Sequence, residues 1–247
     1  MADPNQAGPP HYGFSIRPRT SPSPRNPRIS THSSDADEID RMLAKYGHKI
    51  WGFVIYRSTY ASDSDWAECL RTFRSELEFD LEFLGGLDIL DSNPFTVLED
   101  RDLFDGASAA VVRDHFNAWA LAAPEREQGT GAGGWGGSPR YNFCVQIDER
   151  CLRSILDGNH GGAQSEGFIK LIRGSWQPDP RADRLRASDP VQNLPAYDDV
   201  DGCTAYDIGW AKIRQEKYLA FFCALQNQNF WQSGYKRPPL VSSTDAI

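Results

Sequence analysis

One apolar run that ends in polar residues and leads directly into a helix constrains this fold more than any other feature. Residues 49–57 (KIWGFVIYR) are rich in β-branched and aromatic side chains, which is typical of a strand packed on both faces. Ser62, with Asp65 three residues later, has the pattern of a helix start. Because polar groups gather where a strand end faces a helix N-terminus, we expect a site within reach of a ligand here.

The same pattern of strand, polar corner and capped helix occurs twice more. Residues 95–98 form a predicted strand, which an acidic corner and a helix capped by Ser108 follow. Residues 140–147 form another, and Asp148 is positioned to cap the short helix after it. The helix predicted over residues 63–79 has a single apolar stripe, which indicates that it packs on a core. The stripe consists of Trp66, Cys69, Leu70, Phe73 and Leu77.

Five further segments complete the predicted fold. They are a helix over 34–46, strands over 167–173 and 206–214, a lid or mobile loop over 177–204, and a strand or buried helix over 218–225. Together these segments predict an α+β fold, with a mixed or antiparallel sheet, helices packed on one face and a ferredoxin-like character. A parallel doubly wound sheet is the rival.

Composition divides the 247 residues into three parts. We expect one α+β domain over residues 34–240 and a frayed tail over 241–247. Residues 1–33 form a Pro/Ser-rich arm with four arginines and no acid between Asn5 and Ser34, which predicts disorder. The arm could contact phosphates or be an inert tail. With no secretory leader and no apolar run long enough to span a bilayer, the chain is predicted to be cytoplasmic, without a membrane partner.

Familiar cofactor and metal motifs are missing. Five cysteines are widely spaced without a C-x-x-C pair, which argues against disulfides and zinc. The GTGAGG run at 129–134 follows no predicted strand and is interpreted as a loop. We therefore predict no metal and no cofactor. Cys203, in a loop before a strand, is the cysteine to test first as a nucleophile, although it has no evident histidine partner.

Four carboxylates crowd one corner between a strand and a helix, namely Glu99, Asp100, Asp102 and Asp105. They could form a solvated helix turn with Arg101 as an internal partner. They could instead form a pocket for a guanidinium or amine. In that pocket one carboxylate would hold the cation, and another, whose pKa its neighbours raise, would take a proton.

Arginine and tyrosine side chains mark the predicted strand ends. Arg57 and Arg140 could clamp a phosphate or carboxylate, and Tyr60 and Tyr141 could relay a proton or stack on a base. They could equally be salt-bridging surface groups.

Taken together, four groups of segments resemble a family of filamentous-fungal hypothetical proteins, over roughly residues 48–240. The resemblance extends to the arginine-containing cyclodipeptide synthases. It rests on residues 51–57 with Tyr60 and Trp66, residues 99–102 with 105–108, residues 140–142, and residues 202–204 with 206–210.

The resemblance implies an aminoacyltransferase that joins arginyl-tRNA and a second aminoacyl-tRNA into a cyclo(Arg-Xaa) diketopiperazine for secondary metabolism. The chain does not resemble the bacterial cyclodipeptide synthases. The alternative is a non-enzymatic ligand-binding or interaction protein. From the sequence patterns, the predicted catalytic residues are Glu99, Asp100, Asp102, Tyr60 and Tyr141. The predicted substrate-binding residues are Arg57, Asp105, Arg140, Asp207 and Trp210.

Overall fold

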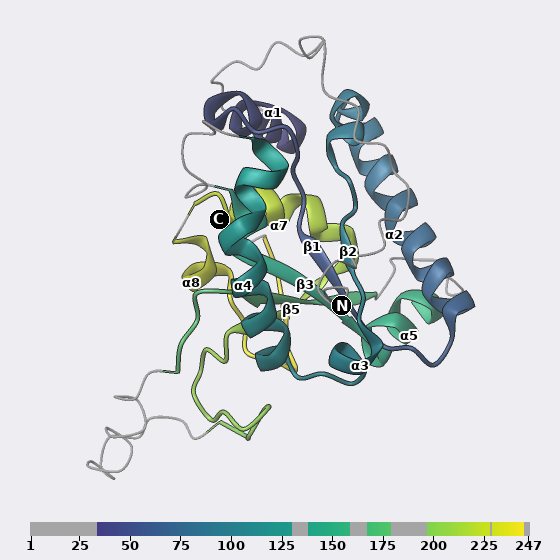
Figure 1. Cartoon of the computed structure of the whole chain (residues 1–247), viewed down its shortest axis with the longest axis vertical. Coiled ribbons are helices and arrows are strands. Elements are labelled where there is room, and N and C mark those ends of the chain that lie inside the picture. Colours follow the sequence, from purple (N-terminus) through teal and green to yellow (C-terminus); the bar gives the residue numbers. More distant parts are fainter. Residues whose placement is uncertain (1–33, 130–137, 159–166, 179–196, 228, 245–247) are drawn as a thin grey trace, which may run out of the picture.

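A computed structural model describes residues 34–129, 138–158, 167–178, 197–227 and 229–244 (Figure 1). The predictions for the arm over 1–33, for residues 130–134 of the Gly-rich loop and for most of the 177–204 loop lie outside the described residues.

The described strands form one six-stranded mixed sheet in the order β2-β1-β3-β4-β5-β6. β1 pairs in parallel with both β2 and β3, and β6 pairs in parallel with β5, whereas β4 is antiparallel to both of its neighbours. The mixed sheet confirms the predicted α+β class. The strand bounds are β1 Val54–Ser58, β2 Val97–Leu98, β3 Phe143–Asp148, β4 Phe168–Arg173, β5 Trp210–Arg214 and β6 Val241–Ser242.

Helices begin where the sequence supplies caps. The side chains of Ser62 and Ser108 each accept a hydrogen bond from a first-turn backbone N–H, as predicted. Ser34 caps α1 in the same way, so all three serines satisfy donors that a helix start leaves free. The helix bounds are α1 Asp35–Tyr46, α2 Asp63–Phe83, α3 Arg101–Phe104, α4 Ala109–Gln128, α5 Glu149–Gly158, α7 Tyr218–Ala224 and α8 Phe230–Gly234. Short 3-10 turns cover Leu87–Ser92 (η1), Pro139–Tyr141 (η2) and Gln215–Lys217 (η3). No described helix is both long and apolar enough to cross a bilayer.

The helices cover both faces of the sheet, which differs from the expected one-sided arrangement. Along β1, Ile55 packs with α2, α5 and α7, while Val54 and Tyr56 pack with α4 on the other face. Figure 1 shows α4 crossing the strands. The chain moves across the sheet in one direction from β1 to β2, and in the other direction from β2 past β1 to β3. Because crossover connections between parallel strands have the same handedness, these two connections lie on opposite faces of the sheet. β1, β2 and β3 thus form the doubly wound arrangement named above as the rival.

Several element bounds differ from the predictions for local reasons. β1 begins only at Val54, because Gly52 has φ +92° and any Cβ there would lie 2.7 Å from Asn93 Nδ2. β5 begins at Trp210, after Gly209 with φ +78°. The 218–225 segment is the helix α7. The tail does not fray at residue 241, because Val241–Ser242 pairs with β5.

Candidate functional site

A pocket of about 730 Å³ lies outside the carboxyl ends of β1 and β3, and we call it the strand-end pocket. Residues that follow β1, β2 and β3 supply most of its lining, and β4 and the loop before β5 supply the rest. The lining consists of Ser58, Thr59, Tyr60, Ala61, Arg101, Asp105, Gly106, Ala107, Ser108, Asp148, Glu149, Arg150, Lys170 and Asp201.

The topology explains why a pocket opens at this edge. The chain leaves β1 toward the face that α2 covers and leaves β2 toward the face that α4 covers. Neighbouring parallel strands whose connections part to opposite faces leave a crevice at their carboxyl ends, where open α/β sheets bind ligands. The register places Ser58, the last residue of β1, beside Asp148, the last residue of β3.

A buried amide lies beneath the pocket. Gln146 is fully buried, and its Nε2 donates to Ser58 Oγ at 3.1 Å and to the Ala107 carbonyl at 2.8 Å. These bonds join the end of β1 to the segment between α3 and α4. The Gln146 side chain therefore fixes the distance between two walls of the pocket.

Charges of both signs line the pocket, and they differ in how far they are already paired. Asp148 forms an ion pair with Lys170 at 2.7 Å. Glu149 accepts hydrogen bonds from the Thr59 hydroxyl and from Arg153. By contrast, the exposed Asp105 side chain has no hydrogen bond or ion pair within the described part of the chain. Asp105 is thus the pocket carboxylate with the greatest capacity to bind an incoming cation.

The pKa directions follow from these contacts. Burial raises the pKa of Asp148, but the hydrogen bond and charge of Lys170 outweigh burial, and the net pKa is lowered. Hydrogen bonds from Thr59 and Arg153 lower the pKa of Glu149. Both carboxylates are therefore ionised near neutral pH and are weak bases.

Tyr60 is the pocket residue best placed to donate a proton. Its Oη accepts a hydrogen bond from the Asp100 backbone N–H at 2.8 Å, and within the described part of the chain its own O–H donates to no other residue. Burial is the largest cause that raises the pKa of Tyr60, so the phenol stays protonated at neutral pH.

Arg57 lies behind the pocket rather than in its lining. Its Nε donates to the Thr59 carbonyl at 2.8 Å, and its guanidinium lies over the rings of Tyr60 and Trp66 at 4.4 and 5.2 Å. It also pairs with Asp63 and lies 3.6 Å from Glu99. These contacts make Arg57 a positioning residue for the 58–60 segment.

Of the four acids in the predicted corner, the structure brings only Asp105 into the lining. Glu99 faces Arg57, and Asp100 caps α3 by accepting from the Leu103 N–H at 3.1 Å. Asp102 is exposed in the first turn of α3. The other three acids of the corner flank the pocket without forming its wall.

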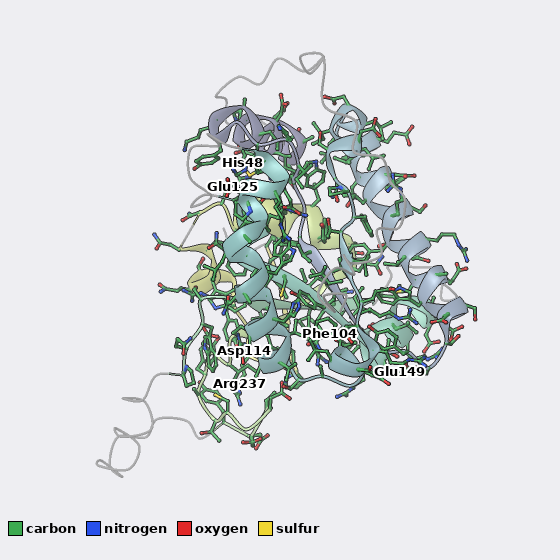
Figure 2. All side chains as sticks on the ribbon, viewed as in Figure 1. His48, Phe104, Asp114, Glu125, Glu149 and Arg237 are labelled. Atoms are coloured by element: carbon green, nitrogen blue, oxygen red, sulfur yellow. The ribbon has the colours of Figure 1, made fainter. Side chains whose placement is uncertain are left out.

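Arg140 and Tyr141 lie at the opposite end of the sheet. They precede β3, and Arg140 bonds to Glu127, near the end of α4, and to the Gly52 carbonyl before β1. Figure 2 shows Glu125, in the last turn of α4, far from Glu149 at the start of α5. The structure therefore does not bring these two predicted residues to the strand-end pocket.

The remaining predicted residues lie outside the pocket lining. Trp210 donates from Nε1 to Asp201 at 2.9 Å, and Lys170 lies over its ring at 4.9 Å. Asp207 instead accepts from Trp231 Nε1 at 2.8 Å. Cys203 forms a short antiparallel bridge with Val200 and is not part of the lining.

Sequence reasoning missed Asp148, Glu149, Lys170 and Asp201 as site residues. Asp148 is the predicted cap, accepting from the Cys151 N–H at 2.9 Å, and it also faces the pocket. The signal available in the sequence was that Asp148 directly follows a second predicted strand. Lys170 reaches Asp148 because β4 pairs antiparallel with β3, opposite Gln146, and that register cannot be derived from one sequence.

Comparisons with protein-family models, with curated proteins and with solved structures gave no match. Among the residues that the structure describes, no three His, Cys, Asp or Glu side chains are grouped to hold a metal ion.

Proposed function

We propose that this chain is an aminoacyl-tRNA-dependent cyclodipeptide synthase whose strand-end pocket holds an arginyl group. One observation carries the proposal: a pocket lined by acidic and basic side chains lies outside the ends of parallel strands. The reaction is the one that the resemblance to the arginine-containing cyclodipeptide synthases implies. An enzyme that consumes aminoacyl-tRNA would work in the cytoplasm.

The charges of the pocket match those of the proposed substrate. An arginyl ester of tRNA carries a guanidinium and an amine at one end and phosphodiester anions at the other. Asp105 and Asp201 are exposed carboxylates that could accept charge-assisted hydrogen bonds from the guanidinium. Arg101 and Arg150, exposed on the same lining, could contact the phosphates of the acceptor end.

The reaction needs two aminolysis steps. In the first, the amine of one aminoacyl ester attacks the ester carbonyl of the other. A C–N bond forms, the C–O bond to ribose breaks, and a proton passes from the nitrogen to the ribose oxygen. In the second, the free amine of the dipeptidyl ester closes the ring and releases the other tRNA in the same way. Holding the two esters together supplies much of the acceleration.

Within this proposal, Tyr60 relays the proton: its O–H protonates the departing ribose oxygen while its Oη takes the proton that the attacking nitrogen loses. Its phenol is protonated at neutral pH, Oη accepts from the Asp100 N–H, and its O–H donates to no described residue. Arg57 holds the Tyr60 ring from behind through the contact between guanidinium and ring at 4.4 Å.

A second candidate is a protein that binds a cationic ligand without chemistry. It is favoured by the fact that Asp148 and Glu149 already hold Lys170 and Arg153 and have lowered pKa values, so neither is a strong base.

The test is product formation by the purified full chain with arginyl-tRNA and a mixture of other aminoacyl-tRNAs, followed by mass spectrometry. We expect an arginine-containing diketopiperazine. Asp105→Asn should lower its rate at least about tenfold, the loss expected for one charge-assisted hydrogen bond. Asp102→Asn is the matched control, because Asp102 is an exposed acid of the same corner outside the pocket lining, and it should keep the rate.

Arginine binding in the pocket without any product would support the second candidate and end the first. Absence of both product and binding would contradict both candidates.

A further inference from the structure

The carboxyl half of α2 and the turn after it present an apolar surface that nothing in the described part of the chain covers. Phe79, Phe83 and Leu87 are 68%, 83% and 48% exposed. Phe79 and Phe83 are four residues apart on one helix and therefore lie on the same side of it. We call these three side chains with the acids around them the α2 face. Neighbouring exposed rings on a protein surface usually mark a contact site.

The α2 face is also strongly acidic. Residues 75–92 contain six acids and no lysine or arginine: Glu76, Glu78, Asp80, Glu82, Asp88 and Asp91. Two of these acids already have a nearby cation from a flanking segment, since Arg74 pairs with Glu78 and the charge of Lys217 acts on Asp80. The last turn of α2 has no basic residue, so these acids add to the negative end of the helix dipole. A partner for this face should therefore combine positive charge with apolar side chains.

We propose that residues 5–33 of the same chain dock on the α2 face. This segment carries Arg17, Arg19, Arg25 and Arg28 and no acid, and it includes the apolar side chains Tyr12, Phe14 and Ile16. Its charge and its apolar groups complement those of the α2 face. The inference does not depend on the proposed function.

The attachment point of the segment lies beside the α2 face. Residue 34 caps α1. Burial is the main cause that raises the pKa of Asp80 in α2, Lys217 opposes it, and the charge of Asp35, the first residue of α1, adds to the rise, so the start of α1 lies near Asp80. Each residue of an extended chain spans roughly 3.3 Å, so Phe79 and Phe83 are well within reach. Covalent attachment also gives such a segment an effective concentration in the millimolar range.

Charge argues against the other occupants. A second copy of this chain would bring the same acids to the contact, and like charges across an interface are unfavourable. A nucleic acid would bring phosphates to an acidic surface and is disfavoured for the same reason.

The test uses the full chain with a photoreactive benzoylphenylalanine in place of Phe83. After irradiation, mass spectrometry should find crosslinks within one chain to residues 5–33. The matched control carries the same group in place of Leu121, which is 77% exposed on α4, and should give no such crosslinks. Replacing the four arginines by serine should reduce the yield severalfold, and replacing them by lysine should retain it.

A second measurement avoids the unnatural residue. The rates at which phenylglyoxal modifies Arg17, Arg19, Arg25 and Arg28 should rise severalfold when Phe79→Ser and Phe83→Ser are combined, whereas Leu121→Ser should leave them unchanged. Crosslinks that join two chains, crosslinks only within residues 34–244, or equal modification rates in the two variants would each overturn the proposal.

Discussion

At the amino end of β1 and β3, Arg140 is fully buried, and at the carboxyl end the charged side chains surround an open pocket. Arg140 donates to both carboxylate oxygens of Glu127 at 2.6 and 2.7 Å, and to Gly52 O and Thr96 Oγ1, each at 2.8 Å. The exposed Asp105 makes no such bond within the described residues. The same residue types therefore complete the fold at one end and remain available to a ligand at the other.

The difference shows which charges are candidates for function. A buried ion pair such as Arg140 with Glu127 holds neighbouring segments together, and losing one partner is costly. Around the strand-end pocket, the charges are exposed and incompletely paired. Because water solvates them, they lower the stability of the fold little, and a ligand can replace that water. Burial and pairing therefore separate structural from functional charges better than residue type does.

The largest expected effect is at the amino end. Glu127→Gln would leave Arg140 buried without a counter-charge and should lower the free energy of unfolding by about 3–5 kcal/mol. Urea denaturation measures this change in the free energy of unfolding. Glu125→Gln, which changes an exposed acid two residues away, is the control and should unfold at the wild-type urea concentration. Equal midpoints for the two variants would show that the buried pair contributes nothing, and the comparison between the two ends would fail.

The next effect is a pKa change in the pocket. In Lys170→Met, burial of Asp148 persists without its main cation, so the pKa of Asp148 should move from below its ordinary value to above it. Carbon-13 NMR titration of the carboxyl group measures this. Because the native pKa is lowered, Asp148 stabilises the fold above its unfolded pKa, and this contribution is lost as the pH falls through the folded value. In the variant the sign reverses, and Asp148 favours the fold at low pH instead.

Lys236→Met, which removes an exposed lysine elsewhere, should leave the pKa of Asp148 unchanged. A pKa that stays low in Lys170→Met would mean that the ion pair does not control this carboxylate.

The smallest effect concerns Glu76, a half-buried acid whose burial is intermediate between that of Arg140 and that of the exposed pocket charges. Burial, followed by the charges of Glu216 and Asp80, raises the pKa of Glu76 from 4.5 to about 7. A raised native pKa stabilises the fold most below pH 4.5, and that contribution is lost as the pH rises through about 7. Glu76→Gln should therefore reduce the fall in melting temperature between about pH 5 and pH 8.

Glu82→Gln, an exposed acid on the same helix, should keep the full fall in melting temperature. Identical pH profiles for Glu76→Gln and the wild type would contradict the prediction.

Local signals in the sequence predicted the helix starts and the general place of the site. Ser62 and Ser108 cap their helices as expected, because capping depends on neighbouring residues only. Tyr60 and Asp105 line the pocket because they follow the ends of β1 and β2.

What the sequence could not provide was strand direction and register. Arg140 and Tyr141 precede a strand, whereas Tyr60 follows one. Once β1 and β3 are known to be parallel, the two groups must lie at opposite ends. Lys170 reaches the pocket through antiparallel pairing with β3, and Trp210 lies under Lys170 through pairing with β4. Such pairings join residues far apart in the chain, and no local pattern encodes them.

A crystal structure of the full chain with a non-hydrolysable arginyl-adenosine tests the central claim most directly. The account predicts the guanidinium within hydrogen-bond distance of Asp105 in the strand-end pocket, with the adenosine toward Arg101 or Arg150. Arginine bound instead at the amino end beside Glu127, or against the exposed Asp102 with the pocket empty, would contradict it.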